Sequence, residues 1–287
     1  MSVDDLPLAV LASRIRLEEK LLLAELDRRR VPFSVLDTRT TVFGPGADFR
    51  FRGALTREIG HTRNLYATRM LEHAGVTVVN TSAILDTCGD KLFTTLALER
   101  AGLPVPRWMA TLTPQGALPA LAGFGYPAVV KPVVGSWGRL AARLDGHDAA
   151  EAVLEHREAL PGPVNGITYV QEYIDKPGRE IKAYVMGGET VGAIYKSSDE
   201  WRTNTKRGGV PSVCTPDDEL LKLLTATAEA IGDGVLGIDV LEDRSGAYYV
   251  NEVNHTPEFH GALDVLDVDL VGRYVDHVLS RVGGSGA

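Results

Sequence analysis

The stretch 235–254, VLGIDVLEDRSGAYYVNEVN, decides the fold of this chain. Two apolar runs, 235–241 and 248–253, flank a short turn that contains Ser245 and Gly246. Apolar runs separated by so few turn residues are typical of two antiparallel strands. The stretch therefore predicts a β-hairpin, and we expect the remaining elements to be arranged around it.

Acidic and amide side chains gather on one face of this hairpin. If Ser245-Gly246 is a two-residue loop, Asp239 lies directly opposite Glu252. Asn254 shares the face of Glu252, because side chains alternate along a strand, and it faces Gly237. Two carboxylates about 5 Å apart repel each other unless a cation neutralises them, and oxygen ligands suit Mg²⁺. The pattern predicts a magnesium site; the alternative is a solvated polar face, and one extra loop residue would turn Asp239 away.

A second cluster predicts an anion site. Lys131 lies inside the apolar run 128–134, and a lysine on a buried strand needs an anionic partner. The small-residue loop that follows brings backbone N–H groups near a phosphate. Its residues are Gly135, Ser136, Trp137, Gly138 and Arg139. An ordinary turn is the alternative, since the loop matches neither the Walker A pattern nor the dinucleotide-binding fingerprint.

Other segments are compatible with a nucleotide. Lys91 begins a predicted helix, where it either is exposed or shares a phosphate with the helix N-terminus. The strand end Gln171-Glu172-Tyr173-Ile174 can offer main-chain groups to an adenine edge, and Glu180 can reach a ribose. Taken alone, that strand end is simply part of a sheet.

Strands and helices alternate along the rest of the chain. This order predicts a small, mostly parallel sheet over about the first 85 residues. The expected strands are 8–12, 31–36, 76–80, 128–134, 139–144 and 168–174, with a hairpin of 180–186 and 191–196. The expected helices are 18–30, 63–74, 90–101, 148–159, 217–231 and 269–281. Residues 197–212 are expected to form a long polar loop, and such loops are often functional.

Composition limits the classes of protein. A net charge of −8 over 287 residues argues against general nucleic-acid binding. No apolar run reaches the roughly 20 residues that a membrane helix needs. The acidic start of the chain is unlike a secretory signal, and Cys88 and Cys214 are too few for a disulfide framework. We expect a reduced, cytoplasmic protein without membrane contact.

The charge is unevenly distributed. Residues 1–70 carry 12 Lys or Arg against 9 Asp or Glu, although the whole chain is acidic. Six arginines lie between 39 and 69: Arg39, Arg50, Arg52, Arg57, Arg63 and Arg69. They form either a solvated face or a docking surface for an acidic partner.

These pieces, in this order, resemble the ATP-grasp superfamily and within it the RimK-like group. The resemblance covers nearly all of residues 60–260 and is densest around Lys91, residues 131–140 and residues 251–256. It implies an α/β fold with α+β elements, built of three subdomains with ATP between two of them. The expected division is an N-terminal α/β (pre-ATP-grasp) domain 1–85, a central domain 86–175 with a lid at about 115–175, and a C-terminal domain 176–287.

The resemblance also implies roles for residues. Lys131 and Arg207 would act in catalysis, and Asp239, Glu252 and Asn254 would bind magnesium. The implied nucleotide-binding residues are Lys91, Lys131, Gly135, Ser136, Trp137, Gly138, Arg139, Leu140, Gln171, Glu172, Tyr173, Ile174, Arg179, Glu180, Lys182 and Asn204. The implied substrate-binding residues are Lys196, Thr205, His255, Thr256, Pro257, Glu258 and Phe259.

The chain is most similar to the LysX-type ligases of lysine biosynthesis. These join 2-aminoadipate to the C-terminal glutamate of the small acidic carrier protein LysW, using ATP and Mg²⁺. The resemblance implies the same kind of carrier, an amino-acid substrate, an acyl-phosphate route and a homo-oligomer, either dimer or tetramer. Lys196 stands where the family usually has Arg, and His260-Gly261-Ala262 replaces the usual Lys-Asn-Ser. These departures leave open a different amino acid and a role in specialised metabolism.

Three other functions stay open at this point. A glutamate–carrier ligase of arginine or ornithine biosynthesis would differ only around Lys196 and residues 255–260. A ligase that adds glutamate to a ribosomal-protein tail would accept that tail and ignore the carrier. A non-catalytic nucleotide-binding regulator is disfavoured by the full set of acids and lysines.

Overall fold

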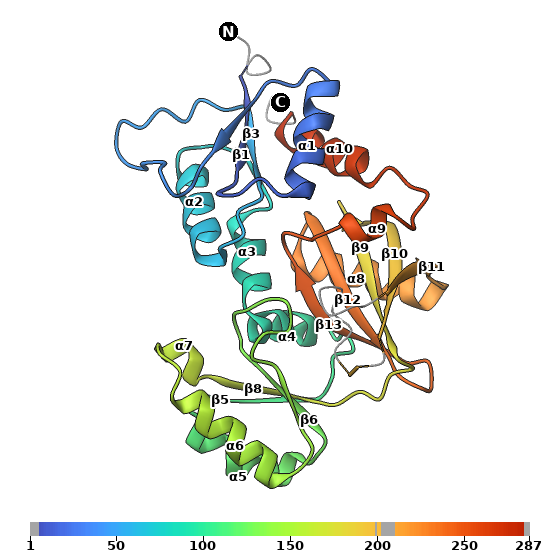
Figure 1. The fold of residues 1–287 in the computed structure, drawn as a ribbon. Helices are drawn as coiled ribbons and strands as arrows, with labels where there is room; N and C mark the ends of the chain where they lie inside the picture. Colours follow the sequence, from blue (N-terminus) through green and yellow to red (C-terminus); the bar gives the residue numbers. More distant parts are fainter. Residues whose placement is uncertain (1–5, 199, 202–209, 284–287) are drawn as a thin grey trace.

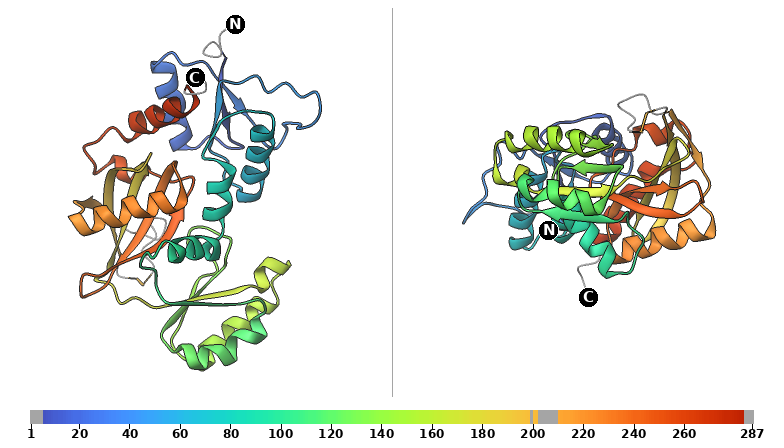
Figure 2. Two further views of the ribbon diagram at one scale, coloured as in Figure 1. Left: turned by 180° about the vertical axis from the view of Figure 1, so that it is seen from behind. Right: turned by 90° about the horizontal axis from the view of Figure 1, so that it is seen from below.

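The protein's structure is a computed structural model that describes residues 6–198, 200–201 and 210–283. The described strands form three sheets (Figure 1). The N-terminal sheet and the sheet built from residues 108–172 lie at opposite ends of the molecule, and a five-stranded sheet lies between them (Figure 2). The mixture of helices with parallel and antiparallel sheets confirms the predicted α/β class with α+β elements.

The N-terminal sheet is parallel in the order β2-β1-β3-β4. Its strands are β1 (Leu8–Leu11), β2 (Phe33–Leu36), β3 (Gly53–Thr56) and β4 (Val78–Val79). The helices of this part are α1 (Leu17–Arg28), α2 (His61–His73) and α3 (Ser82–Gly89). The small parallel sheet was predicted, but β3 was not, because its four residues carry no alternating pattern.

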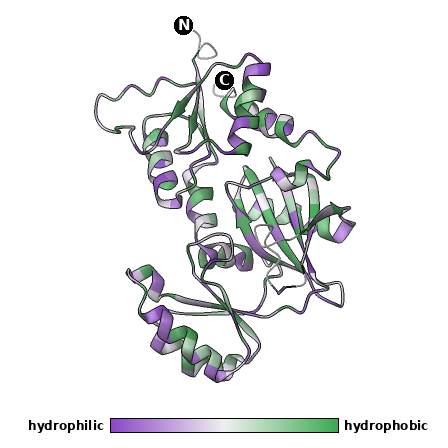
Figure 3. Cartoon of the chain, viewed as in Figure 1, coloured by the Kyte–Doolittle hydropathy of each residue, from purple (hydrophilic) through white to green (hydrophobic). Residues whose placement is uncertain are grey.

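The second sheet is antiparallel in the order β5-β8-β6-β7. Its strands are β5 (Trp108–Thr111), β6 (Ala128–Lys131), β7 (Ala142–Leu144) and β8 (Thr168–Glu172). Helices α5 (Pro114–Phe124) and α6 (His147–Glu158) cover its outer face, and α7 (Pro163–Gly166) precedes β8 (Figure 1). Helix α5 is mostly apolar, whereas α6 carries both hydrophilic and hydrophobic residues (Figure 3).

Lys131 is the last residue of β6, which corrects the prediction that it lies inside a strand reaching residue 134. Pro132 follows at once. A proline has no backbone N–H to donate to the sheet, so the strand cannot continue through it. Because Lys131 stands at the end of the strand, its side chain can project toward the neighbouring sheet.

The third sheet is antiparallel in the order β11-β10-β9-β12-β13. Its strands are β9 (Arg179–Met186), β10 (Glu189–Ser197), β11 (Val210–Cys214), β12 (Val235–Glu242) and β13 (Tyr248–Asn254). The expected loop over 197–212 is therefore wrong at both ends, since β10 includes Ser197 and β11 begins at Val210. Pairing of β11 with β10 overrides the polar local sequence.

Helices surround this third sheet. Helix α4 (Lys91–Arg100) begins at its N-cap Asp90, whose carboxylate accepts the N–H of Leu92 at 2.8 Å. Helix α8 (Asp218–Ile231) packs against the sheet, while α9 (His260–Leu263) and α10 (Leu270–Val282) follow β13. No helix of the described residues is long and apolar enough to cross a membrane.

In the β12–β13 hairpin, Asp239 and Glu252 pair as predicted, but the loop and the strand differ from the prediction. The loop is one residue longer than expected, because Asp243 pairs with Ala247. That extra residue would have put Asp239 on the wrong face. A bulge in β13 at Asn251 compensates for it, so Asp239 pairs with Glu252 as predicted.

A buried ion pair joins the N-terminal part to the segment after β13. Arg57 and Glu19 both have fully buried side chains, and Arg57 Nε donates to Glu19 Oε1 at 2.8 Å. Arg57 Nη1 also donates to the carbonyl of Pro257 at 3.1 Å. The guanidinium lies 5.9 Å from the ring centroid of Phe259. Arg57 thus holds the 257–259 segment against the N-terminal sheet.

The arginines between 39 and 69 are largely neutralised by neighbours. Five of the six form ion pairs within the described residues, and Arg57 is buried. Exposed pairs such as Arg50–Asp48 present little net charge to a partner. The docking interpretation stays a prediction, and it rests on fewer residues than the sequence suggested.

Replacing Arg57 should destabilise the fold. Arg57→Ala removes one of the two arginines that pair with the buried Glu19 and also the hydrogen bond to the Pro257 carbonyl. Losing hydrogen bonds of a charged group should cost about 2–3 kcal/mol in the free energy of unfolding. Arg50→Ala, which removes an exposed pair, is the matched control and should leave stability unchanged. Chemical denaturation of both variants measures this, and an Arg57→Ala midpoint equal to that of the control would contradict it.

Candidate functional site

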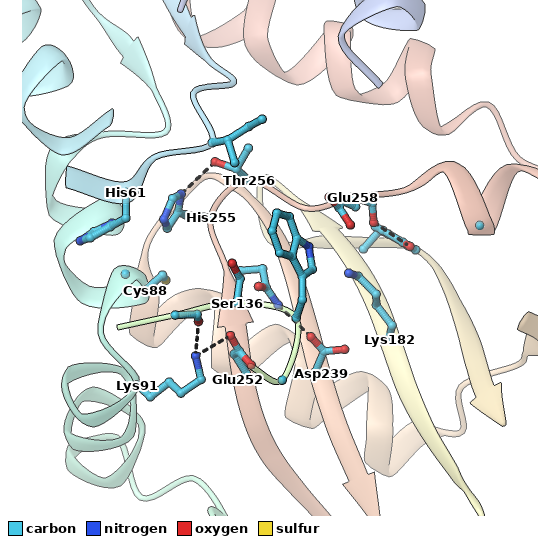
Figure 4. Close-up of a pocket in the computed structure, with 18 of the residues that line it drawn as sticks. His61, Cys88, Lys91, Ser136, Lys182, Asp239, Glu252, His255, Thr256 and Glu258 are labelled. Atoms are coloured by element: carbon cyan, nitrogen blue, oxygen red, sulfur yellow. Dashed lines mark hydrogen bonds and ion pairs between the residues drawn. The ribbon is translucent and has the colours of Figure 1, made fainter. Parts of the chain in front are cut away.

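Two cavities meet at the β12–β13 hairpin. The larger, about 610 Å³, is lined by the N-terminal part, the loop after β6 and the third sheet. The smaller, about 120 Å³, lies between the second and third sheets. Seven residues line both: Lys91, Gly135, Ser136, Gly138, Lys196, Asp239 and Glu252. Whatever occupies one cavity can therefore reach the contents of the other at this junction, part of which Figure 4 shows.

Acids and lysines are paired at the junction. Asp239 Oδ1 accepts Lys196 Nζ at 2.5 Å, and Asp239 Oδ2 accepts the Asn254 amide at 2.7 Å. Glu252 Oε1 lies 3.1 Å from Lys91 Nζ (Figure 4). The three side chains predicted to bind magnesium thus converge, and lysines neutralise both carboxylates. Their oxygen donors fit a hard divalent cation, provided that the Asn254 amide rotates to present its oxygen.

Burial and charge shift the pKa values of the central pair in opposite directions. Burial alone would raise the pKa of Asp239, but Lys196 and Lys182 lower it overall. Burial alone would lower the pKa of Lys196, but Asp239 and Glu180 raise it overall. Both groups are therefore ionised at neutral pH, and the junction carries fixed charges.

Lys131 reaches the third sheet from the end of β6. Its Nζ donates to Asn251 Oδ1 at 2.7 Å and to Gln171 Oε1 at 2.5 Å. Burial lowers the pKa of Lys131 to about 8, although Glu252 favours the charged form. Among the described residues, the hydrogen-bond partners of this ammonium group are neutral oxygens, so a phosphate would be a stronger partner.

The smaller cavity has the lining of a nucleotide site. Its apolar residues include Val129, Ile174 and Leu241, and the predicted segment 171–174 runs along it. Glu172 accepts the Arg107 N–H through its carboxylate at 2.7 Å, and its own N–H donates to the Arg107 carbonyl at 2.8 Å. Glu180 accepts a hydrogen bond from Lys176, and both line the cavity.

The loop after β6 covers the junction. Lys91 Nζ donates to the carbonyl of Gly135 at 2.6 Å, which ties the loop to helix α4. Gly138 has a φ of 63°, and Trp137 and Leu140 have similar positive values that side chains rarely adopt. Arg139 lies over the Trp137 ring at 5.0 Å. Gly135, Ser136, Gly138 and Arg139 line the smaller cavity, while Leu140 lines neither and is exposed.

The segment after β13 forms one wall of the larger cavity. His255 Nδ1 lies 2.9 Å from the Thr256 hydroxyl, and the Asn80 amide donates to the His255 carbonyl at 2.7 Å. Burial and the adjacent His61 lower the pKa of His255 to about 3, so its ring is neutral at physiological pH. Glu258 accepts Arg16 Nη1 at 2.9 Å.

Several predicted residues lie elsewhere. Arg179 is paired with Glu242 at 2.9 Å and lines neither cavity, so its nucleotide contact stays a prediction. Phe259 is 2% exposed in the hydrophobic core, and Pro257 also lines neither cavity. Lys182 was expected to bind the nucleotide, but it lines the larger cavity and not the smaller one. Asn204, Thr205 and Arg207 lie outside the described residues.

Some lining residues were not predicted. Asn251 lies in the hairpin stretch and was assigned no role, yet at the bulge its side-chain oxygen accepts a hydrogen bond from Lys131. Arg16 enters the larger cavity from the start of α1, and Lys176 and Trp201 line the smaller one. A basic residue before a helix gives no local signal of such a role, because tertiary folding alone brings Arg16 to residue 258.

Comparison with known proteins gives the family context. The RimK-like ATP-grasp domain matches residues 88–278, and the LysX preATP-grasp domain matches residues 8–87. The glutamate–LysW ligase ArgX of Sulfolobus acidocaldarius is 33% identical over 274 residues, covering 94% of this chain and 97% of that protein. The α-aminoadipate–LysW ligase LysX of Saccharolobus solfataricus is 36% identical over 212 residues, covering 74% and 77%. The crystal structure of a RimK domain ATP-grasp protein from Sphaerobacter thermophilus has a TM-score of 0.79 and 26% identity, over 94% of this chain and 98% of that one.

The Lys131 pKa makes phosphate binding depend on pH. Lys131 is charged below about pH 8 and loses its charge as the pH rises through that value. Nucleotide affinity should therefore fall above pH 8, by up to about tenfold per pH unit. Lys131→Arg, which stays charged, should flatten the profile. Calorimetric Kd values for a non-hydrolysable ATP analogue measure this, and a wild-type Kd that stays constant to about pH 9.5 would contradict it.

Proposed function

This chain belongs to the RimK-like ATP-grasp family, and we propose that it joins the amino group of 2-aminoadipate, or a related amino acid, to the C-terminal glutamate of a small acidic carrier protein of the LysW type. The family consists of ATP-dependent ligases, and the predicted ATP-grasp fold is confirmed by the solved relatives. The observation that carries the proposal is the junction of the two cavities at paired lysines and acids.

The smaller cavity would hold ATP with its phosphates at the junction. Val129, Ile174 and Leu241 offer an apolar surface to the adenine, and the main chain of 171–174 offers its edge polar groups. Lys91 and Lys131 would contact the phosphates from two different elements. The predicted three-domain division, with ATP between two of the domains, agrees with this placement.

Magnesium would be held by Asp239, Glu252 and Asn254. When bound, it neutralises charge on the phosphates during transfer. Lys196 and Lys91 would then exchange their carboxylate partners for phosphate oxygens, so the lysines remain paired throughout. The chain thus keeps the junction close to electrically balanced, both without ligands and with them.

The larger cavity would hold the carrier's terminal glutamate and the amino acid. A carrier carboxylate oxygen attacks the γ-phosphorus, which gives an acyl phosphate and ADP. The amine then attacks the acyl carbon and releases inorganic phosphate, forming the amide bond. Lys91, Lys131 and Arg207 would stabilise the transferred group, and the loop 135–140 would exclude water. We assign no general base.

The identity of the amino acid has two candidates. LysX of Saccharolobus solfataricus uses α-aminoadipate by name, and ArgX of Sulfolobus acidocaldarius uses glutamate. The ArgX match spans more of this chain, which favours keeping glutamate as the second candidate. The wall formed by Lys196, His255, Thr256 and Glu258 would set the choice. We further propose a cytoplasmic homo-oligomer, dimer or tetramer, in lysine-type or specialised biosynthesis.

Intact mass of the carrier identifies the amino acid directly. A LysW-type carrier incubated with enzyme, MgATP and a panel of amino acids should gain the mass of one residue of 2-aminoadipate or a close relative. Gain of glutamate instead would select the second candidate. No mass gain with any amino acid, while a ribosomal-protein tail is extended, would overturn the proposal.

Removal of one carboxylate tests the metal assignment. Glu252→Gln should lower turnover by about 10²-fold or more without lowering the melting temperature, because a charged ligand is lost. Glu242→Gln, on the same hairpin but outside both cavities, is the control and should turn over normally. The Mg²⁺ concentration for half-maximal activity should rise only in the first variant. Normal turnover of Glu252→Gln would rule the assignment out.

A further inference from the structure

Lys182 is placed to contact whatever fills the larger cavity. It lies on β9, between Asp239 of β12 and Ile194 of β10 in the sheet register. Its side chain points into the cavity between Asp239 and Glu258 (Figure 4). Unlike Lys91 and Lys196, it does not line the smaller cavity. Any partner of its ammonium group should therefore belong to the carrier or the amino acid.

The acids nearest to Lys182 are already engaged. Asp239 accepts Lys196 and Asn254, and Glu258 accepts Arg16. Within the part of the chain that the structure describes, the Lys182 ammonium forms no ion pair, and it lies 5.9 Å from the centroid of the Tyr184 ring. Lysines at the junction, by contrast, each have an oxygen partner.

A partly buried Lys182 ammonium group without an anionic partner is energetically unfavourable unless a ligand supplies one. The Lys182 side chain is only partly exposed to solvent. A partly buried cation without an anion is normally avoided in proteins. Gly237 leaves room beside it: a Cβ there would lie 3.5 Å from Lys182 Cε and 2.8 Å from Pro257 Cβ. The missing anion should come from the substrate.

We infer that Lys182 binds a carboxylate of the incoming amino acid and thereby selects acidic amino acids over their amides or decarboxylated analogues. The inference rests on the proposed function. The carrier carboxylate that is activated must lie at the junction to meet the phosphate, whereas Lys182 lies outside the shared set of residues. Contact of Lys182 with the second carboxylate of the carrier's glutamate is the competing outcome, and it would impair the carrier hydroxamate reaction. The shared chemistry is a carboxylate, which is either the α-carboxylate or the side-chain carboxylate of the amino acid.

Two half-reactions separate this role from nucleotide binding. With ATP, carrier and hydroxylamine but no amino acid, hydroxylamine attacks the acyl phosphate and releases inorganic phosphate, leaving a carrier hydroxamate. Lys182→Gln should form this hydroxamate at the wild-type rate, which also shows that the variant is folded. Its KM for the amino acid should rise about 10- to 100-fold, with an unchanged KM for ATP.

Analogues identify which carboxylate is bound. Wild type should prefer glutamate or 2-aminoadipate over the matching side-chain amide or over the α-decarboxylated amine. Lys182→Gln should lose one of these two preferences, and that preference names the carboxylate. Lys182→Arg should keep it, and Lys222→Gln, an exposed change on α8, should behave as wild type.

Different failures have different meanings. If wild type makes neither hydroxamate nor ligated carrier, the proposed function fails. If wild type works but Lys182→Gln loses hydroxamate formation, Lys182 serves the nucleotide or the carrier, and the inference is overturned. Unchanged preferences and KM values in Lys182→Gln overturn it as well.

Discussion

Charge neutralisation at the end of the β12–β13 hairpin is the constraint on which the site depends. Strand pairing forces Asp239 and Glu252 to face each other. Carboxylates so close need cations, and Lys196 and Lys91 supply them at 2.5 Å and 3.1 Å. Those lysines come from different parts of the fold, so the electrostatic requirement also determines which elements must meet at the junction.

Three separate structural units contribute cations at the junction or directly beside it. Lys91 starts helix α4, Lys131 ends β6 of the second sheet, and Lys196 lies on β10 of the third. A ligand with several negative charges would contact all three at once. Its binding would hold the second sheet against the third, because Lys131 of the second sheet and Lys196 of the third would contact the same ligand. Substrate binding and the relative position of the sheets are therefore linked by the same contacts.

Sequence predicted the parts that depend on local pattern. The hairpin, the parallel N-terminal sheet and the pairing of Asp239 with Glu252 all follow from alternation and turn residues. The pairing was correct although the loop was one residue longer than expected, since the bulge at Asn251 restored the register. The bulge could not be predicted from the hairpin sequence, and its extra residue, Asn251, contacts Lys131 of another sheet.

Long-range packing determines which side chains line the cavities, and the sequence alone did not predict this for three residues. Phe259 belongs to a motif that suggested substrate contact, yet Arg57 and the core enclose it. Arg16 has no motif and still lines the larger cavity, because Glu258 lies opposite it only in the folded chain. Lys182 lies at an ordinary position of β9, and the sequence pattern gives no sign of its surroundings. Only the folded structure shows that it has no ion-pair partner among the described residues.

Anomalous scattering from Mn²⁺ tests the central claim most directly. A crystal grown with Mn²⁺ and ADP should show a metal peak bounded by Asp239, Glu252 and Asn254, with Lys91 moved from Glu252 to a phosphate oxygen. A metal peak that none of these three side chains contacts, with the Lys91–Glu252 pair intact beside bound ADP, would contradict the account.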